Sequence, residues 1–374
     1  MPKEKAKRNK VVVAMSGGVD SSVAAALLKG AGVNVVGVFM KFWTPLGDKT
    51  EGKWNRCCSP ESEIRARKVA KILDIPFYVF NFEKEFKKRI VDYFLKESKK
   101  GLTPNPCVIC NKEIKFGLLL EKALRMNADF IATGHYACTT FSNQILRKIA
   151  MAEIRSMDRI KLLEGKDKNK DQSYFLWRLN QNQLKRVLFP IGDYTRAEVE
   201  KLAKRFKLPF AGVRKSQEIC FIPNTIEDFL KRHLKSKPGE IITKEGKIIG
   251  KHQGLWFYTI GQRKGIGLPG GPHYVLDKDV KKNTLIVTKN ERDLLKKELI
   301  ARNVRWISGK KPKLPLKVQA KIRYRHMPAS ATITKILHSA SYILKFARPQ
   351  RAITPGQSVV FYKREELLGG GIIC

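Results

Sequence analysis

A glycine-rich loop between two apolar segments is the first part of the chain that could carry out chemistry. Residues 11–15 form an unbroken apolar run, which is typical of a strand buried on both faces of a parallel sheet. Two serines and two glycines follow within residues 16–21, and residues 21–28 favour a helix. Backbone N–H groups and a helix N-terminus converge in such a loop, so we predict a phosphate site. No lysine follows the glycines as in a Walker loop, and the alternative is an ordinary glycine turn with Asp20 as the helix cap.

Cysteines supply the second set of reactive side chains. Cys107 and Cys110 form a CxxC pair at the start of a predicted helix, where the pKa of a thiol is lowered. A third thiol, Cys220, lies in an apolar segment, where a buried structural cysteine is the alternative. One CxxC supplies only two of the four ligands of a structural zinc site. A thioredoxin-type redox pair is another alternative, although the motif does not follow the first strand of a small βαβ domain.

Two further polar segments are candidates for ligand contacts. Residues 128–133 predict a strand, and Gly134 at its end would let a ligand approach closely. His135 follows and is either functional or structural. Lys170 and Asp171 lie in a polar stretch that a plain charged loop would explain equally well.

These residues need a scaffold, and the chain alternates strands with helices. Strands are predicted at 34–40, 77–82 and 128–133 besides the first, with helices at 60–74 and 86–99. This alternation predicts an α/β, Rossmann-like domain with a doubly wound parallel sheet over residues 1–221. Ligands bind at the carboxyl ends of such strands, where Met40 would lie beside the loop unless it is a plain core residue.

The pattern changes after residue 221. A hairpin at 238–250 and a glycine-rich stretch predict a small, mostly-β adaptor domain over residues 222–293. Short strands at 316–323, 331–336, 342–346 and 358–362 predict a C-terminal β-barrel over residues 294–374. Its arginines and lysines interleave with aromatic residues, which suits phosphate contacts and base stacking or, alternatively, a solvated basic face.

Charge is the unusual quantity of this 374-residue chain, since 74 Lys and Arg against 34 Asp and Glu give a net charge of +40. Such a surplus predicts a polyanionic partner, and we favour nucleic acid over an anionic membrane surface. The alternative is that the charge reflects a generally basic proteome and no particular partner. No apolar run is long enough to span a bilayer. The basic N-terminus lacks the apolar core of a signal peptide, and seven dispersed cysteines do not suggest a secreted disulfide framework, so we expect a cytoplasmic protein.

Ten segments, in order along the chain, carry a resemblance to one enzyme family. SGGVDSS resembles the PP-loop of the ATP pyrophosphatases, which cleave ATP between the α- and β-phosphates. The others are TPNPCVICNKEIKFG, IATGHY, NKDQSYFLW, SQEICFI, GEIIT, HQGLWFYTIGQRKG, YVLDKDV, RYRH and TPGQSVVFY. Together they span nearly the whole chain and closely resemble the tRNA-specific 2-thiouridylase family of the MnmA type.

The resemblance implies a site for ATP and magnesium. The hydroxyls of Ser16 and Ser21 would hold the departing pyrophosphate, with Asp20 near the magnesium ion. The full set implied at the nucleotide is Ala14, Met15, Ser16, Gly17, Gly18, Val19, Asp20, Ser21, Met40 and Gly134.

The resemblance also implies roles for the thiols. Cys110 would be the nucleophile and Cys220 the persulfide carrier, with a Cys110–Cys220 disulfide formed during turnover. Many family members carry aspartate where this chain has Cys107. Cys107, Cys110 and Cys220 would therefore alternatively hold a [4Fe–4S] cluster whose open iron carries hydrosulfide.

The implied reaction is adenylation of uridine O2 at the tRNA wobble position, followed by sulfur transfer. Asn105, Pro106 and Cys107 would meet the base, and the other implied tRNA contacts are His135, Lys170, Asp171, Gln172, Arg323, Tyr324 and Gln357. We expect a monomer, supplied with sulfur by a cysteine desulfurase or relay protein. A PP-loop enzyme with another acceptor, such as a 4-thiouridine synthase or an amidotransferase-type synthetase, is one alternative. A tRNA-binding or iron–sulfur-sensing protein without catalysis is the other.

Overall fold

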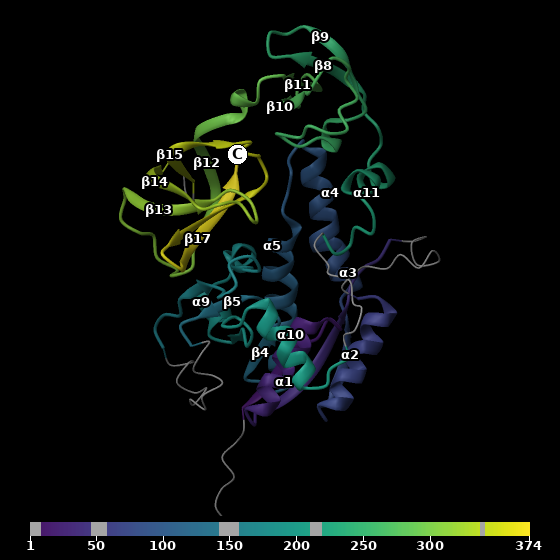
Figure 1. The fold of residues 1–374 in the computed structure, drawn as a ribbon, viewed down its shortest axis with the longest axis vertical. Helices are drawn as coiled ribbons and strands as arrows, with labels where there is room; N and C mark the ends of the chain where they lie inside the picture. Colours follow the sequence, from purple (N-terminus) through teal and green to yellow (C-terminus); the bar gives the residue numbers. More distant parts are fainter. Residues whose placement is uncertain (1–8, 46–57, 142–156, 210–218, 337–340) are drawn as a thin grey trace, which may run out of the picture.

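The computed structural model describes residues 9–45, 58–141, 157–209, 219–336 and 341–374. Figure 1 shows three parts: an α/β part at the lower end, a small sheet at the opposite end, and a barrel beside them. The helices labelled α4 and α5 run lengthwise between the α/β part and the small sheet. This arrangement confirms the predicted fold class.

The α/β part is built on a five-stranded parallel sheet in the order β3-β2-β1-β4-β7. The chain winds outward from β1 through β2 to β3 and then returns to the other side of β1 with β4. The carboxyl ends of β1 and β4 therefore form the topological switch point, where open α/β sheets bind ligands. The strands are β1 (Lys10–Ala14), β2 (Asn34–Lys41), β3 (Phe77–Asn81), β4 (Phe130–Thr133) and β7 (Val187–Leu188).

Helices surround this sheet, and local sequence signals set where several begin. Ser59 caps α2 by accepting a hydrogen bond from the Ser62 N–H, and Thr195 forms a capping box with Glu198 at the start of α10. The predicted helix at 86–99 is a continuous run of α3, the π-helical η1 and α4. The helices are α1 (Val19–Gly30), α2 (Pro60–Ile72), α3 (Glu83–Phe86), η1 (Lys87–Val91), α4 (Asp92–Lys99), α5 (Pro106–Cys110), η2 (Asn111–Leu118), α6 (Leu119–Arg125), η3 (Ser173–Leu176), α9 (Gln181–Leu184) and α10 (Arg196–Arg205).

The small sheet has the order β10-β11-β8-β9 and a core of its own around Ile241, Val275 and Leu285. β8 and β9 pair antiparallel, so the predicted hairpin is confirmed. The elements are α11 (Ile226–His233), β8 (Gly239–Thr243), β9 (Ile248–His252), η4 (Leu255–Phe257), β10 (Tyr274–Asp279), β11 (Thr284–Thr288) and η5 (Glu291–Leu294).

The barrel closes because β12 pairs with both β15 and β17. Its strands are β12 (Leu295–Trp306), β13 (Leu316–Lys321), β14 (Ala329–Ile336), β15 (Tyr342–Arg351), β16 (Ser358–Lys363) and β17 (Glu366–Ile373). β17 also pairs with β6 (Leu162–Glu164), and β6 pairs with β5 (Ala137–Thr139). Two strands that follow β4 thus extend the sheet of the barrel. The sequence did not predict them, because three residues are too few to show an alternating pattern.

Candidate active site

The PP-loop, residues 16–21, connects β1 to α1 at the switch point. The Ser16 N–H donates to Ser21 Oγ at 3.2 Å, and the two serine hydroxyls lie 3.4 Å apart. The Ser21 hydroxyl also lies 3.1 Å from the Gly18 carbonyl oxygen. Gly18 is the N-cap of α1 and has no side chain that could bond the first-turn N–H groups. These groups point out of the helix and suit an anion.

Two glycines allow the backbone to come together around this loop. Gly17 has a φ of +71°, and a β-carbon there would lie 2.1 Å from the Ser62 carbonyl oxygen. A β-carbon on Gly134 would lie 2.5 Å from the Ser21 nitrogen. Only glycine fits at either position. The structure therefore places Gly134, at the end of β4, directly against the PP-loop.

Asp20 in the first turn of α1 has two close partners. The Tyr136 hydroxyl donates to Asp20 Oδ1 at 2.8 Å, and Arg196 Nη1 lies 2.6 Å from the same oxygen. Burial and the neighbouring Asp20 charge raise the pKa of Tyr136, so its hydroxyl remains a donor. Burial lowers the pKa of Arg196, but the Asp20 charge and the contacts with Glu200 and Tyr136 together outweigh this, and the net pKa is raised. Neither partner was predicted from the sequence, although the capping box that starts α10 marks the place of Arg196.

The other residues implied at the nucleotide line the strand ends beside the loop. Ala14 and Met15 are buried, and the Met15 N–H bonds the Val38 carbonyl oxygen at 2.8 Å. Met40, near the end of β2, is 9% exposed, and Val19 is partly buried. Their contact with a nucleotide stays a prediction.

The CxxC pair lies on α5, which begins at Pro106 as predicted. Cys107 is partly exposed, whereas Cys110 is 7% exposed and closes the helix before the π-helical η2. Asn105 is the N-cap but does not cap with its side chain, which instead bonds the Tyr174 hydroxyl.

Cys220 is partly exposed and precedes a buried aromatic anchor. The Phe221 ring packs edge-on against three other rings, with centroid distances of 5.4 to 5.8 Å, from Phe86, Phe94 and Phe229. This packing fixes the chain on the carboxyl side of the thiol. The residues on its amino side, 210–218, which include the SQE of the SQEICFI segment, lie outside the described residues.

A metal site at the three cysteines is not supported. Cys107, Cys110 and Cys220 all belong to the described residues, and in that part of the chain no three His, Cys, Asp or Glu side chains are grouped to hold a metal ion. The [4Fe–4S] cluster considered from the sequence therefore stays a prediction, and no step of the proposed reaction uses one.

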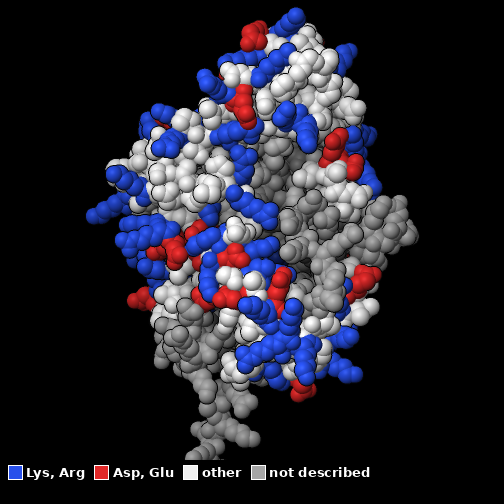
Figure 2. Space-filling model, in the orientation of Figure 1, with Lys and Arg blue, Asp and Glu red and all other residues white. Residues whose placement is uncertain are grey.

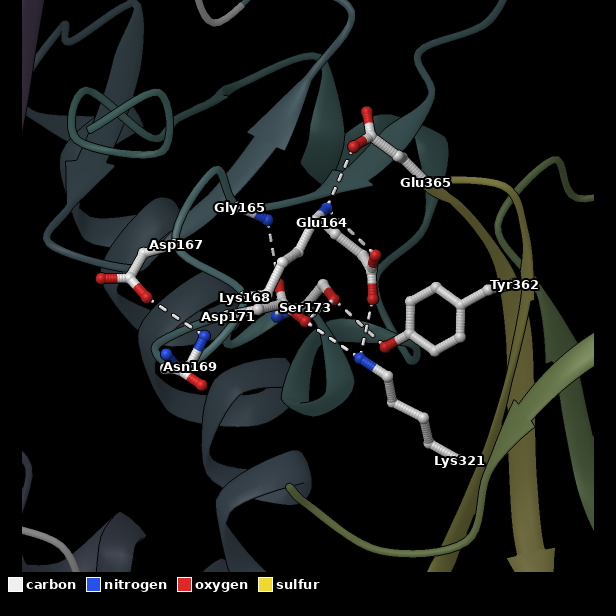
Figure 3. Close-up of polar contacts among 10 residues, drawn as sticks. All are labelled: Glu164, Gly165, Asp167, Lys168, Asn169, Asp171, Ser173, Lys321, Tyr362 and Glu365. Carbon is white, nitrogen blue, oxygen red and sulfur yellow. Dashed lines mark hydrogen bonds and ion pairs between the residues drawn. The ribbon is translucent and has the colours of Figure 1, made fainter. Parts of the chain in front are cut away.

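Asp171 differs from its expected role as a tRNA contact (Figure 3). It is 4% exposed and accepts hydrogen bonds from the N–H groups of Gly165 and Ser173, at 3.0 and 3.1 Å. Lys321 of the barrel reaches Asp171 at 3.5 Å and Glu164 at 2.7 Å. Burial raises the pKa of Asp171, although these hydrogen bonds and the lysine charge oppose the shift. Asp171 therefore joins the barrel to the α/β part and presents no free carboxylate to RNA.

His135 and Gln172 also face the protein. The His135 ring is 8% exposed, lies between the Phe116 and Phe189 rings, and shares a 2.8 Å hydrogen bond with Thr133. Burial and the Lys115 charge hold the pKa of His135 well below its usual value, so it is a neutral core histidine rather than a phosphate contact. The Gln172 side chain accepts from the Tyr136 N–H at 3.0 Å. Lys170 is partly exposed.

Of the three implied contacts on the barrel, Tyr324 and Gln357 lie against the α/β part, whereas Arg323 bonds within the barrel. Arg323 donates to the Arg351 carbonyl oxygen at 2.9 Å, and the Tyr324 ring lies 4.5 Å from the Phe175 ring. Gln357 donates to the Thr103 carbonyl oxygen at 2.8 Å. All three are partly exposed. The side-chain amide of Gln357 thus bonds the backbone of the segment that leads to the CxxC helix.

Family profiles match three consecutive parts of the chain. They describe a tRNA methyl transferase HUP domain over residues 9–224, a tRNA methyl transferase PRC-barrel domain over 227–289, and an aminomethyltransferase beta-barrel domain over 296–373. The tRNA-specific 2-thiouridylase MnmA 2 of Thermoanaerobacter sp. (strain X514) is 47% identical over 369 residues, which cover 98% of each chain. MnmA 1 of Caldanaerobacter subterraneus subsp. tengcongensis is 49% identical, again over 98% of each chain, and MnmA of Nitrosomonas europaea is 46% identical at the same coverage.

The chain belongs to the tRNA-specific 2-thiouridylase family. This membership confirms the resemblance of the ten segments, and it accounts for the PP-loop, the CxxC pair and the barrel in a single chain. No helix within the described parts of this 2-thiouridylase is long and apolar enough to cross a membrane. Figure 2 shows Lys and Arg gathered over the barrel and the lower part of the visible face, with fewer Asp and Glu among them.

Proposed function

We propose that this enzyme thiolates the wobble uridine of tRNA at C2, as an ATP-dependent sulfurtransferase. The observation that carries the proposal is the PP-loop at the switch point, with the open N-terminus of α1 and Asp20 beside it, in a chain whose relatives are named tRNA-specific 2-thiouridylases. A phosphate-binding loop is needed because the C2 oxygen of uracil is a poor leaving group until ATP activates it.

The PP-loop would hold the pyrophosphate part of ATP, with the Ser16 and Ser21 hydroxyls and the first N–H groups of α1 as donors. Asp20, with 36% of its side chain exposed, would hold magnesium together with phosphate oxygens and water, which fits the preference of Mg²⁺ for one or two carboxylates. When bound, magnesium neutralises charge that develops on the departing pyrophosphate.

The reaction would proceed in three steps. Uridine O2 attacks the α-phosphorus of ATP, so that pyrophosphate leaves and an adenylated uridine forms. The terminal sulfur of a Cys220 persulfide then attacks C2, and the C2–O bond breaks to release AMP. Finally the Cys110 thiolate attacks the inner sulfur of Cys220, which leaves 2-thiouridine and a Cys110–Cys220 disulfide. An external thiol reduces this disulfide, and a cysteine desulfurase or relay protein restores the persulfide.

The base must leave its stack to reach the PP-loop and the thiols. Asn105, Pro106 and Cys107 at the start of α5 would meet it, and Lys170, Arg323 and Tyr324 would contact the surrounding tRNA. The net charge of +40 supports binding to a polyanion. We propose a monomer that acts in the cytoplasm, where a reducing environment keeps the thiols available.

The test incubates the protein with ATP, magnesium, unmodified tRNA and a persulfide donor, and quantifies 2-thiouridine and AMP by mass spectrometry. We expect one AMP for each 2-thiouridine, and loss of 2-thiouridine in Cys110→Ser and Cys220→Ser. Cys374→Ser, at an exposed thiol of the barrel, is the matched control. Formation of 4-thiouridine, or AMP release without any thiolated nucleoside, would contradict the proposal.

A further inference from the structure

The approach segment, residues 101–105, leads into the CxxC helix. Both the barrel and the small sheet form hydrogen bonds with it. The Thr103 N–H donates to the Pro355 carbonyl oxygen at 3.0 Å, and the Thr103 carbonyl oxygen accepts from Gln357 at 2.8 Å. From the small sheet, Lys278 Nζ donates to the Gly101 carbonyl oxygen at 2.7 Å. The barrel and the small sheet therefore hold the same short stretch of backbone.

The first two residues of the approach segment bond the end of α4, where the Gly101 and Leu102 N–H groups donate to the Ser98 and Glu97 carbonyl oxygens at 2.8 and 3.2 Å. The rest of the segment has no such local support. Pro104 and Pro106 have no N–H group, so the chain from Thr103 onward cannot form a regular local hydrogen-bond pattern until α5 is under way. Backbone polar groups that leave water need partners. For both polar groups of Thr103 these partners come from the barrel.

Steric fit on both sides shows that the contact is close. A β-carbon on Gly356, where φ is +92°, would lie 2.8 Å from the Thr103 nitrogen. A β-carbon on Gly101, where φ is +77°, would lie 2.8 Å from Val280 of the small sheet. Neither side leaves room for water at these points.

A third tie joins the approach segment to the residue after Gln357. The Asn105 side chain bonds the hydroxyl of Tyr174, which is 1% exposed. The same hydroxyl donates to the Ser358 carbonyl oxygen at 2.8 Å, and Trp177 Nε1 donates to Ser358 Oγ at 3.1 Å. Gln357 is thereby held in register with the segment that it contacts.

We propose that Gln357 and Lys278 are positioning residues, which act on the CxxC thiols by fixing the approach segment. Neither touches the reacting atoms in this assignment. Gln357, expected from the resemblance to contact tRNA, also sets where Cys107 and Cys110 lie, and the small sheet gains a part in sulfur transfer through Lys278. The inference rests on the proposed function for the role of the thiols, whereas the contacts themselves do not depend on it.

Two variants test the proposal, each with a matched control. Gln357→Leu and Lys278→Met remove the two side-chain donors, while Gln319→Leu in the barrel and Lys281→Met in the small sheet change exposed side chains of the same types. Because a shift of about 1 Å can cost on the order of 100-fold in rate, we expect kcat of thiolation to fall by at least about tenfold. The KM for ATP should stay within about twofold of the wild type, since no contact with the nucleotide is removed.

Thiol reactivity gives a second measurement that needs neither tRNA nor ATP. We expect the alkylation rate of Cys107 in the folded protein to change several-fold in Gln357→Leu and Lys278→Met, and to be unaltered in the two controls. If both variants match their controls in kcat and in alkylation, the inference is overturned even where the wild type makes 2-thiouridine. If the wild type makes none, alkylation alone still decides whether the thiols depend on these residues.

Hydrogen exchange on the unaltered enzyme covers the case in which a variant does not fold. The Thr103 amide donates to the barrel, so we expect it to exchange far more slowly than an exposed amide. Exchange at the rate of an unstructured peptide would show that the barrel does not hold the segment, and would overturn the inference.

Discussion

The PP-loop and the approach segment serve the same reaction but obtain their shapes in opposite ways. Hydrogen bonds within the PP-loop join Ser16, Gly18 and Ser21, which lie at most five positions apart. Distant residues add contacts at its edges, from Arg65 to the Gly17 carbonyl oxygen and from Tyr136 and Arg196 to Asp20. The approach segment is held by Lys278 and Gln357, which are 177 and 254 positions away from their partners. The backbone of one half of the site is therefore shaped mainly by its own sequence, and that of the other half mainly by the rest of the molecule.

The two halves should therefore be sensitive to substitutions in different parts of the chain. A loop shaped locally fails when its own backbone is disturbed, and it should tolerate changes elsewhere. A segment shaped by distant partners should fail when those partners change, even though its own sequence is intact.

Gly17→Ala should break the local half. The added β-carbon would lie 2.1 Å from the Ser62 carbonyl oxygen, at a φ of +71°, so the loop must move. We expect kcat/KM for ATP to fall by at least about 100-fold, as displaced contacts at a reacting group do. Gly32→Ala is the control, because Gly32 has a φ of +79° but no atom within 4 Å of the added carbon. Equal losses in both variants would mean that strain rather than loop position matters.

Lys321→Met tests whether the barrel is fixed to the α/β part through a buried charge. The variant leaves Asp171, whose side chain is 3% exposed, without its cation. We expect the free energy of unfolding, measured with urea, to be about 3 kcal/mol lower than in the wild type. Adding Asp171→Asn removes the unpaired charge and should recover part of the loss. No recovery in the double variant would assign the effect to packing instead.

Arg196→Gln tests a distant contact of the PP-loop, since Arg196 and Tyr136 both bond Asp20 from far along the chain. Loss of a charge-assisted hydrogen bond of 2.6 Å to Asp20, which contributes about 1.5–3 kcal/mol, should lower kcat/KM for ATP by roughly 10- to 150-fold. Arg196→Lys should retain part of the activity. Arg205→Gln, at the exposed end of α10, should leave it unchanged, and an equal loss there would point to the helix as a whole.

The smallest effect is a pH dependence at His135. The pKa of His135 is lowered in the folded state. Below the ordinary histidine pKa of about 6.5, the unfolded chain therefore binds more protons than the folded protein. Stability contributed by the neutral ring is present above that pH and is lost as the pH falls, by at most about 1.4 kcal/mol per pH unit. Urea unfolding at pH 7.5 and 5.5 should therefore show a smaller loss in His135→Gln. An identical loss would place the titrating group elsewhere.

The same contrast decides what could be predicted from the sequence. The PP-loop, the start of α5 and the β8–β9 hairpin depend on neighbours in the chain, and their residue types show it. His135 and Asp171 look like solvated polar residues, because the phenylalanines and the lysine that bury them are distant in sequence. Gln357 looks like a loop residue for the same reason. Its partner is a backbone carbonyl, which leaves no trace in the residue types.

The pairing of β17 with β6 limits how this protein can be divided. Three family profiles match in succession, which suggests parts that evolution or an engineer could exchange. Yet Glu366 and Leu367 of the barrel pair with Leu163 and Leu162, so removing the barrel would leave β6 as an open sheet edge. Open edges recruit other chains and promote aggregation. A transplanted barrel would have to bring a strand of its own to this edge, and a truncated catalytic half should be expressed only together with the barrel that covers it.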